Sequence, residues 1–192
     1  MRHYGGEPIH LGIVPDKLPA IRRAIRKAAK ADVLITTGGA SVGDHDLVQA
    51  ALEAEGIKLS FWKIAMRPGK PLMFAKKAKQ RIIGLPGNPV SALVCARIFL
   101  KPLIEAHLGQ TTQEQFRKAR LVLPLKANAE RQDYIRAKLK PHEDGSFRVE
   151  PFSTQDSSMQ KLLAEANALI LRRPHALAAK AGDLVEVLLL DF

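Results

Sequence analysis

The chain has 192 residues, which is enough for one large domain or two small ones. Its hydrophobic share of 46% is typical of globular proteins, and no apolar run approaches the ~20 residues that a membrane-spanning helix needs. The start, Met1 to Gly6, lacks the apolar stretch of a secretory signal, and the single cysteine, Cys95, excludes an internal disulfide bond. We therefore expect a cytoplasmic protein that has no membrane partner.

The formal net charge of +11 leaves three interpretations open. The excess could attract nucleic acid, it could attract a small anionic substrate, or it could be a solvated basic surface, which is the commonest case. Only seven Phe, two Tyr and one Trp are present, and few of them alternate with basic residues. Because base stacking needs such aromatic side chains, a nucleic-acid partner is not expected.

Strands and helices alternate in the first part of the chain. Asp16 can cap a helix over 16–30, where apolar residues follow the helical period. The further elements expected here are a strand at 33–35, a helix at 46–55, strands at 58–66, 72–75 and 81–85, and a long apolar helix at 90–107. This rhythm predicts an α/β domain over 1–110.

After Gln110 the character of the sequence changes. A polar stretch at 111–118 is expected to be a linker, and a mostly β domain is expected over 119–192. Its predicted strands lie at 121–125, 134–140, 146–150, 168–172 and 184–190, and one short helix lies at 159–166. This pattern predicts a small barrel.

The first segment with a chemical role is the loop over 36–46, which follows a strand and opens a helix. Its glycines allow a close backbone approach to a ligand, and free N–H groups at a helix start favour an anion such as phosphate. The residues that could contact such an anion are Thr37, Gly38, Gly39, Ser41 and Gly43. Asp44 or Asp46 could hold Mg²⁺ beside a phosphate, or could simply cap the helix.

The second segment is the turn Arg67-Pro68-Gly69-Lys70-Pro71. Its two prolines stiffen the turn, so Arg67 and Lys70 would be held as two cations in a small space. Fixed cations suit a compact oxyanion. A surface turn with solvated charges is the alternative, and composition alone favours it.

The third segment, 84–92, again joins a strand to a helix start. Asn88 suits the N-cap position and Pro89 suits the first turn, while Ser91 would place a hydroxyl beside free N–H groups. A well-capped helix without a ligand is the alternative. Two such loops in one domain, with a cationic turn between them, indicate one polyanionic ligand.

Taken in order, the motifs Thr-Gly-Gly-x-Ser-Val-Gly-x-x-Asp, Pro-Gly-Lys-Pro and Leu-Pro-Gly-Asn-Pro-Val-Ser-Ala resemble those of the MoeA family, which includes the gephyrin E domain. The later stretches Arg131-x-x-Tyr134-x-Arg136 and Gln155-x-Ser157 look like the C-terminal β domain of that family. The resemblance covers essentially the whole chain. It implies a three-layer α/β domain of the MogA and MoeA type, followed by a small barrel-like domain.

The resemblance also implies a reaction. Family members bind adenylylated molybdopterin together with molybdate, Mg²⁺ or Zn²⁺ promotes cleavage of the pyrophosphate link, AMP leaves, and molybdenum joins the dithiolene. Carried over by motif, the loop from Gly38 to Gly43 and Asp46 would hold the pterin phosphates and the metal.

The family motifs assign further contacts. Arg67, Lys70 and Ser91 would hold molybdate or a nearby phosphate, with Pro71, Gly87, Asn88 and Pro89 shaping the same site. Arg131, Arg136 and Ser157 would add anion contacts from the β domain. Two positions depart from the family pattern: Arg67 stands where Lys is frequent, and Asp156 stands where many relatives have Gly.

A larger departure concerns the start of the chain. The N-terminal domains of the family, and the first strand of its α/β domain with a Thr-Gly-Asp/Asn-Glu segment, have no counterpart here. In relatives the active site is completed by the N-terminal region of the other subunit of a homodimer, and a MogA-like adenylyltransferase supplies the substrate. We therefore expect a piece of a larger protein, with weak ligand binding and little or no turnover alone. A pterin-binding adenylyltransferase of the MogA or CinA type and a non-enzymatic scaffold are the alternatives.

Overall fold

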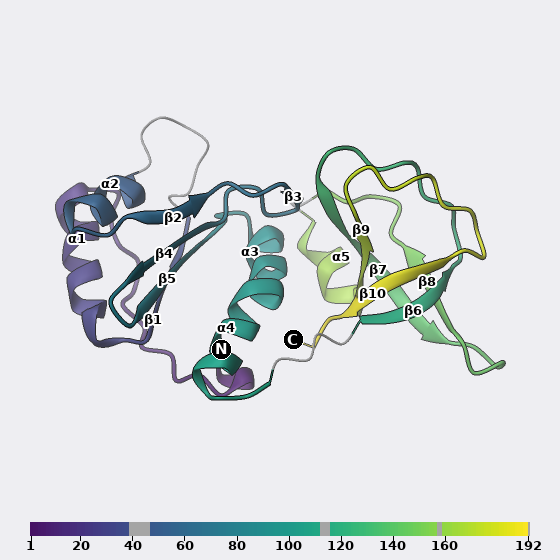
Figure 1. The fold of residues 1–192 in the computed structure, drawn as a ribbon, viewed down its shortest axis with the longest axis horizontal. Helices are drawn as coiled ribbons and strands as arrows, with labels where there is room; N and C mark the ends of the chain where they lie inside the picture. The colour runs from purple at the N-terminus through teal and green to yellow at the C-terminus, as the bar shows by residue number, and fades with distance from the viewer. Residues whose placement is uncertain (39–46, 112–115, 157–158, 192) are drawn as a thin grey trace. The chain divides into compact units, whose positions relative to one another are not determined.

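A computed structural model describes residues 1–38, 47–111, 116–156 and 159–191 of the chain. The chain folds into two compact units (Figure 1). Unit 1 comprises Met1–Ile64 and Gly69–Thr112, and unit 2 comprises Ala65–Pro68 and Gln113–Phe192. No helix in these ranges is both long and apolar enough to span a bilayer.

Unit 1 is built on a four-stranded sheet. Its strands lie in the order β1 (Val33–Thr37), β5 (Gln80–Leu85), β4 (Met73–Lys77) and β2 (Leu59–Trp62). The pair β1–β5 is parallel, while β4 runs antiparallel to both of its neighbours. The carboxyl ends of β1, β5 and β2 and the start of β4 consequently share one edge of the sheet, which we call the carboxyl edge.

Helices cover both faces of this sheet (Figure 1). The helices are α1 (Leu18–Lys27) and α2 (Leu47–Ala54) on one face, and α3 (Pro89–Cys95), a π-helical segment (Ala96–Leu100) and α4 (Lys101–His107) on the other. Ile21 and Ile25 of α1 and Leu52 of α2 pack with Leu34 and Ile82 of the sheet in one buried cluster. The predicted three-layer α/β architecture is confirmed.

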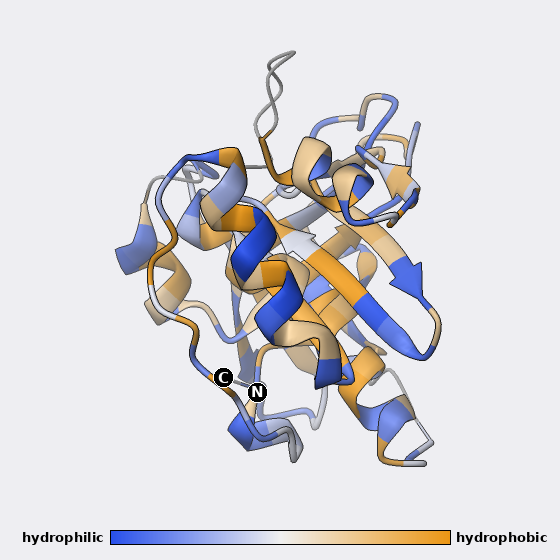
Figure 2. Cartoon of the chain, turned by 90° about the vertical axis from the view of Figure 1, so that its left-hand side faces the viewer, coloured by the Kyte–Doolittle hydropathy of each residue, from blue (hydrophilic) through white to orange (hydrophobic). Residues whose placement is uncertain are grey.

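Helix α1 shows why the sequence folds in this way. Its apolar residues recur at the helical period, so one side is buried while the basic residues remain outside, and Figure 2 shows the alternation of blue and orange along this helix. The helix begins at Leu18 rather than at Asp16, because Lys17 occupies the N-cap position and Pro19 lies in the first turn. The expected cap by Asp16 is therefore wrong.

Two other elements differ from expectation. The strand expected over 58–66 ends at Trp62, because Lys63 adopts a positive φ of 67°. The helix expected over 90–107 is interrupted by the π-helical segment in its middle. Periodicity predicts the length of that helix but not this local change in its hydrogen bonding.

Unit 2 is a closed five-stranded barrel. Its strands are β7 (Gln132–Pro141), β8 (Phe147–Pro151), β6 (Phe116–Leu121), β10 (Leu184–Leu189) and β9 (Ala168–Arg172), and β9 pairs back onto β7. Leu121, Val149, Ile170 and Val187 lie in its core. A single two-residue strand, β3 (Met66–Arg67), pairs with β7, and α5 (Gln160–Glu165) lies before β9. The barrel prediction is confirmed, although β6 begins earlier than the strand expected at 121–125.

Candidate functional site

Two loops meet at the carboxyl edge of unit 1. Because β1 and β5 are parallel, with Thr37 opposite Leu85, the segments that follow both strands emerge side by side. The Gly38 N–H donates to the carbonyl of Leu85 at 3.4 Å. Gly38 has a φ of 80°, a backbone conformation that side chains disfavour, so glycine suits this turn.

Gly87 brings the second loop close to the first. A Cβ atom added to Gly87 would lie 3.3 Å from the Cα of Gly38, which is tighter than an ordinary contact. The two backbones therefore approach each other at positions where neither residue carries a side chain. Such an arrangement leaves main-chain groups accessible to a ligand at the end of the sheet.

Asn88 and Pro89 start α3 as the sequence predicts. The Asn88 side chain accepts a hydrogen bond from the Ser91 N–H at 3.2 Å, and Pro89 occupies the first turn. Ser91 is buried, with 6% of its surface exposed. The Ser91 N–H donates to the Asn88 side chain, so this N–H is not available to bind an anion at the start of α3.

Lys70 and Pro71 lie at the same edge of the sheet. They belong to the connection between β2 and β4, where the Lys70 carbonyl accepts from the Ile64 N–H at 2.9 Å. This connection leads into Met73, which lies opposite Gly84 near the end of β5. Lys70 is exposed and therefore places a cation at the carboxyl edge. The loops that contain Gly38 and Gly87 lie at the same edge.

Arg67 is placed differently from the expectation. It lies in β3, which belongs to unit 2, and it forms an ion pair with Asp133 of β7 in which its Nε is 3.1 Å from the Asp133 Oδ1. The turn that holds Lys70 therefore begins only after Arg67, which is fixed by its ion pair with Asp133 rather than by the prolines of that turn. A contact of both cations with one oxyanion stays a prediction. The pairing was missed because Asp133 is 66 residues away and no local pattern indicates it.

The predicted residues of the β domain are held by local contacts. Arg136 is buried, and its guanidinium donates to the carbonyls of Asp156 at 2.8 Å and Met159 at 3.2 Å. Burial lowers the pKa of this guanidinium, and the charge of Asp156 partly offsets that effect. Gln155 adds hydrogen bonds to the main chain of Arg136, so Arg136 organises this loop. Arg131 is half-buried and lies 3.9 Å from Glu130.

Several predicted residues lie outside the described ranges, so their positions are not assigned. They are Gly39, Ser41, Gly43, Asp44, Asp46 and Ser157. Across the residues that the structure describes, no group of three acidic, histidine or cysteine side chains is suited to hold a metal ion. The described part of the carboxyl edge alone therefore does not make a magnesium site.

Sequence reasoning also missed two polar atoms in the last row of the sheet. Thr36, Gly84, Met73 and Trp62 lie opposite one another across the four strands. The Thr36 Oγ1 and the Trp62 Nε1 are buried without a hydrogen-bond partner. Buried polar groups are usually paired, so the carboxyl edge contains two unsatisfied polar atoms below its surface. Nothing in the strand pattern distinguishes them from ordinary strand residues.

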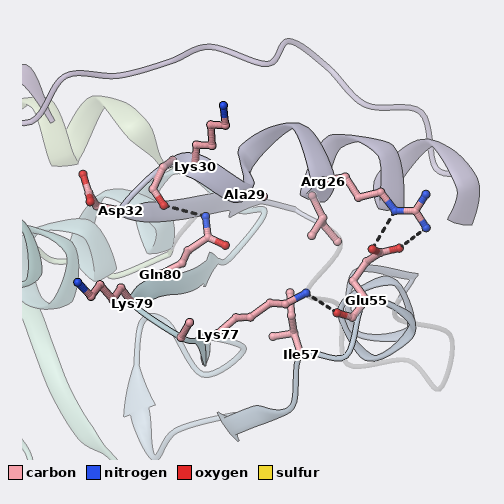
Figure 3. A pocket seen from close by; sticks show the side chains of 12 residues that line it. Arg26, Ala29, Lys30, Asp32, Glu55, Ile57, Lys77, Lys79 and Gln80 are labelled. Atoms are coloured by element: carbon pink, nitrogen blue, oxygen red, sulfur yellow. Dashed lines mark hydrogen bonds and ion pairs between the residues drawn. The ribbon is translucent and has the colours of Figure 1, made fainter.

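A cavity of about 600 Å³ lies at the opposite edge of the same sheet, away from every predicted site residue (Figure 3). Gln80 donates to the carbonyls of Ala28 and Ala31 there, and Lys77 donates to the carbonyl of Glu55 at 2.7 Å (Figure 3). These carbonyls follow the ends of α1 and α2, where cations and donors stabilise the helix dipole. Gln80 and Lys77 are therefore explained by helix capping.

The fold and the edge together define a class of protein: a three-layer α/β domain with a candidate ligand site at the carboxyl edge of its sheet, joined to a small β-barrel. Residues 1–106 match the family described as a probable molybdopterin binding domain, and residues 118–190 match the family described as the MoeA C-terminal region, domain IV. The chain belongs to the MoeA family.

Similar proteins agree with this assignment. The chain is 36% identical over 187 residues to a molybdopterin molybdenumtransferase of Haemophilus influenzae, covering 94% of this chain and 45% of the relative. It is 35% identical over 188 residues to the enzyme of that name in Bacillus subtilis, covering 97% and 44%. A solved MoeA protein from Pyrococcus horikosii matches with a TM-score of 0.80 and 26% identity, over 100% of this chain and 46% of that one. The chain thus spans about half the length of the curated relatives it matches.

Proposed function

We propose that this chain forms the molybdopterin- and oxyanion-binding part of a molybdopterin molybdenumtransferase, in which molybdate is inserted into adenylylated molybdopterin and AMP is released. The observation that supports this proposal is the meeting of three segments at the carboxyl edge. Gly38 and Gly87 bring two loops together there, and Lys70 adds a cation beside them. The match of residues 118–190 to the MoeA C-terminal region favours this function over a MogA- or CinA-like relative, which usually lacks such a domain.

The roles of the side chains follow from their chemistry. The main-chain N–H groups around Gly38 and Gly87 would contact the phosphates of the nucleotide, and Lys70 would neutralise an oxyanion. Thr37, Pro71, Asn88 and Pro89 would shape the same site, and Ser91 would add a hydroxyl. Arg131, Arg136 and Ser157 remain candidate anion contacts from the β domain, and Arg67 remains a candidate contact of molybdate or a nearby phosphate.

The metal and the partners are further parts of the proposal. Mg²⁺ would be held by Asp46 or Asp44, a role that rests on the sequence alone. A homodimer would complete the site, and a MogA-like adenylyltransferase would supply the adenylylated pterin. A cytoplasmic location is also proposed. Burial raises the pKa of the Cys95 thiol to about 12, which keeps this thiol protonated and unreactive.

Lys70 provides the test of this function. Replacing Lys70→Ala removes the cation from the carboxyl edge, so binding of molybdate and adenylylated pterin is expected to weaken by about tenfold. The matched control is Lys76→Ala. Lys76 is exposed, as Lys70 is, but it lies on β4 opposite Arg81, towards the other end of the sheet. Equilibrium dialysis with pterin fluorescence measures both variants. Equal affinities of the two variants would count against the proposed site.

A coupled assay tests the reaction itself. Cofactor formation is measured with adenylylated pterin, molybdate and Mg²⁺, and the chain alone is expected to show little or no turnover. Full molybdate insertion by the chain alone would contradict the proposal that a second subunit completes the site. Weaker Mg²⁺ binding by Asp46→Asn than by the unmodified chain, measured by isothermal titration calorimetry, would support the metal role.

A further inference from the structure

Three basic side chains form one row across neighbouring strands of unit 2. Arg120 of β6 lies opposite Arg148 of β8, and Arg148 in turn lies opposite Lys140 of β7. All three residues are exposed. Their chain neighbours Leu121 and Val149 belong to the barrel core, so the alternation of a strand directs the basic side chains to the outer face. We call these three residues the basic row.

The same sheet places acids opposite its other outward cations. Lys138 lies opposite Glu150, and Lys118 lies opposite Glu186. The basic row has no such arrangement, because its members face one another. Arg120 donates to the Gly182 carbonyl at 3.2 Å, but no ion pair links the basic row to any carboxylate of the residues described.

The basic row is electrostatically unfavourable in the isolated chain. Like charges that lie directly opposite each other destabilise a sheet, whereas opposite charges stabilise it. The pairs Lys138–Glu150 and Lys118–Glu186 show that the same strands accommodate acids opposite outward cations. The repulsion would be relieved by an anionic partner that spans all three strands.

The surroundings of the row indicate what kind of anion fits. Leu184 of β10 lies opposite Arg120 and is 57% exposed, so the row continues into an aliphatic side chain. None of these four residues is aromatic, so the surface offers no platform for base stacking. It is an outer sheet face rather than a hollow, and the two cavities described are lined by residues of unit 1. These features favour a polypeptide over a nucleic acid or a small molecule.

We propose that the basic row, together with Leu184, is a docking surface for an acidic polypeptide segment that carries an aliphatic residue beside its carboxylates. Carboxylates would pair with Arg120, Arg148 and Lys140, and the aliphatic residue would cover Leu184. The surface lies wholly within the barrel and does not depend on the proposed oxyanion site. An experiment can therefore contradict the docking surface without contradicting the proposed function, and the reverse.

A labelled peptide tests this proposal on the full chain. The probe is a short fluorescein-labelled peptide with one Leu followed by alternating Glu and Ser, and fluorescence anisotropy measures its binding. The triple variant Arg120→Glu, Arg148→Glu, Lys140→Glu is expected to bind the probe at least about tenfold more weakly. The control triple variant Lys58→Glu, Lys126→Glu, Lys161→Glu changes the net charge equally at exposed positions outside the row.

The possible results distinguish an acidic peptide from a nucleic acid and from a nonspecific effect of net charge. Loss of affinity confined to the row variant, together with weaker binding of a probe that lacks Leu, supports the docking surface. Equal loss in both triple variants would show that only net charge matters and would overturn the proposal. An oligothymidylate of equal charge that binds as tightly as the peptide, and is lost in the same variant, would overturn it in favour of nucleic acid. Absence of peptide binding to the unmodified chain would also overturn it.

A single substitution provides a second readout that does not require the triple variant to fold. Arg148→Glu places an acid between two cations and should raise the urea midpoint of unfolding while weakening peptide binding. A lower midpoint with an unchanged slope would show that the row is not repulsive and would remove the basis of the proposal.

Discussion

At the scale of single residues, Glu55 shows how one carboxylate joins two elements of unit 1. Arg22 Nε lies 2.7 Å from its Oε1, and Arg26 donates from Nε at 2.9 Å and from its terminal nitrogen at 2.8 Å. Both arginines belong to α1, whereas Glu55 follows α2. Hydrogen bonds from Arg26 and Arg22 lower the pKa of Glu55 from 4.5 to about 2. The carboxylate therefore stabilises the contact between the helices as long as it is ionised.

The pH dependence of stability tests this contact. A folded-state pKa below the unfolded-state value means that the contribution is complete above pH 4.5 and is lost as the pH falls towards about 2. Glu55→Gln should lower the urea midpoint at pH 7, and the difference from the unmodified chain should shrink across that acid range. Glu53→Gln is the control, since Glu53 is exposed and accepts from Gln49. A difference that persists unchanged at low pH would contradict the ionic origin of the effect.

The glycine at position 87 matters because of its distance from the neighbouring loop. Gly87→Ala would push a Cβ atom against the Gly38 backbone, and backbone yields less easily than a flexible side chain. A shift of a few tenths of an ångström at a binding loop is expected to weaken pterin binding by about tenfold. The measurement is the same dialysis assay, with far-UV circular dichroism as a check on folding.

Gly6→Ala is the matched control for that substitution. A Cβ atom at Gly6 would meet Ile104 Cδ1 at 3.5 Å, which is an ordinary contact. Unchanged affinity is therefore expected for this variant. If both variants bind the pterin as well as the unmodified chain, the approach of the two loops does not shape a ligand site.

At the scale of secondary-structure elements, the start of α3 is the part of the site that local sequence specifies most directly. Asn88→Ala removes the acceptor for the Ser91 N–H, and loss of such a cap costs about 1 kcal/mol. The expected result is a lower urea midpoint with an unchanged slope. Asn88→Asp keeps an acceptor and should retain most of the stability. Equal losses in both variants would indicate that the amide serves a purpose other than capping.

The elements that could be predicted are those whose signals are local. The cap at Asn88, the turn at Gly38 after β1 and the alternating strands of the barrel all follow from residues that are near one another in sequence. The placement of Arg67 could not be predicted, because β3 pairs with β7 across a long separation and joins a different unit from Lys70. The π-helical segment after Cys95 was missed because its apolar pattern resembles that of a continuous α-helix.

At the scale of the whole molecule, two opposing properties determine how copies of the chain interact. A net charge of +11 keeps copies apart, and this repulsion weakens as salt screens it over a length of about 10 Å. In unit 1, however, β1 has a strand neighbour on only one side among the residues described. Because alternate residues of a strand direct their main-chain groups to opposite sides, Val33, Ile35 and Thr37 face that open side.

Apolar side chains are exposed in the same unit. Ile9 is 76% exposed, Leu11 40% and Ile13 101%, and these residues alternate along the chain as in a strand. An unpaired strand edge and an exposed run of alternating apolar residues are both prone to pair with another chain. We expect the chain to self-associate, and the association to become stronger as salt concentration rises.

Sedimentation velocity over a range of protein and salt concentrations measures this balance. Ile13→Lys adds a charge and removes the most exposed apolar side chain of this run, so it should shift the chain towards the monomer at every salt concentration. The control is Leu177→Lys, because Leu177 is 85% exposed but belongs to unit 2. If the two lysine variants dissociate equally, net charge rather than the apolar run controls association. If salt dissociates the unmodified chain, charge pairing holds the copies together, and the open side of β1 is not the contact.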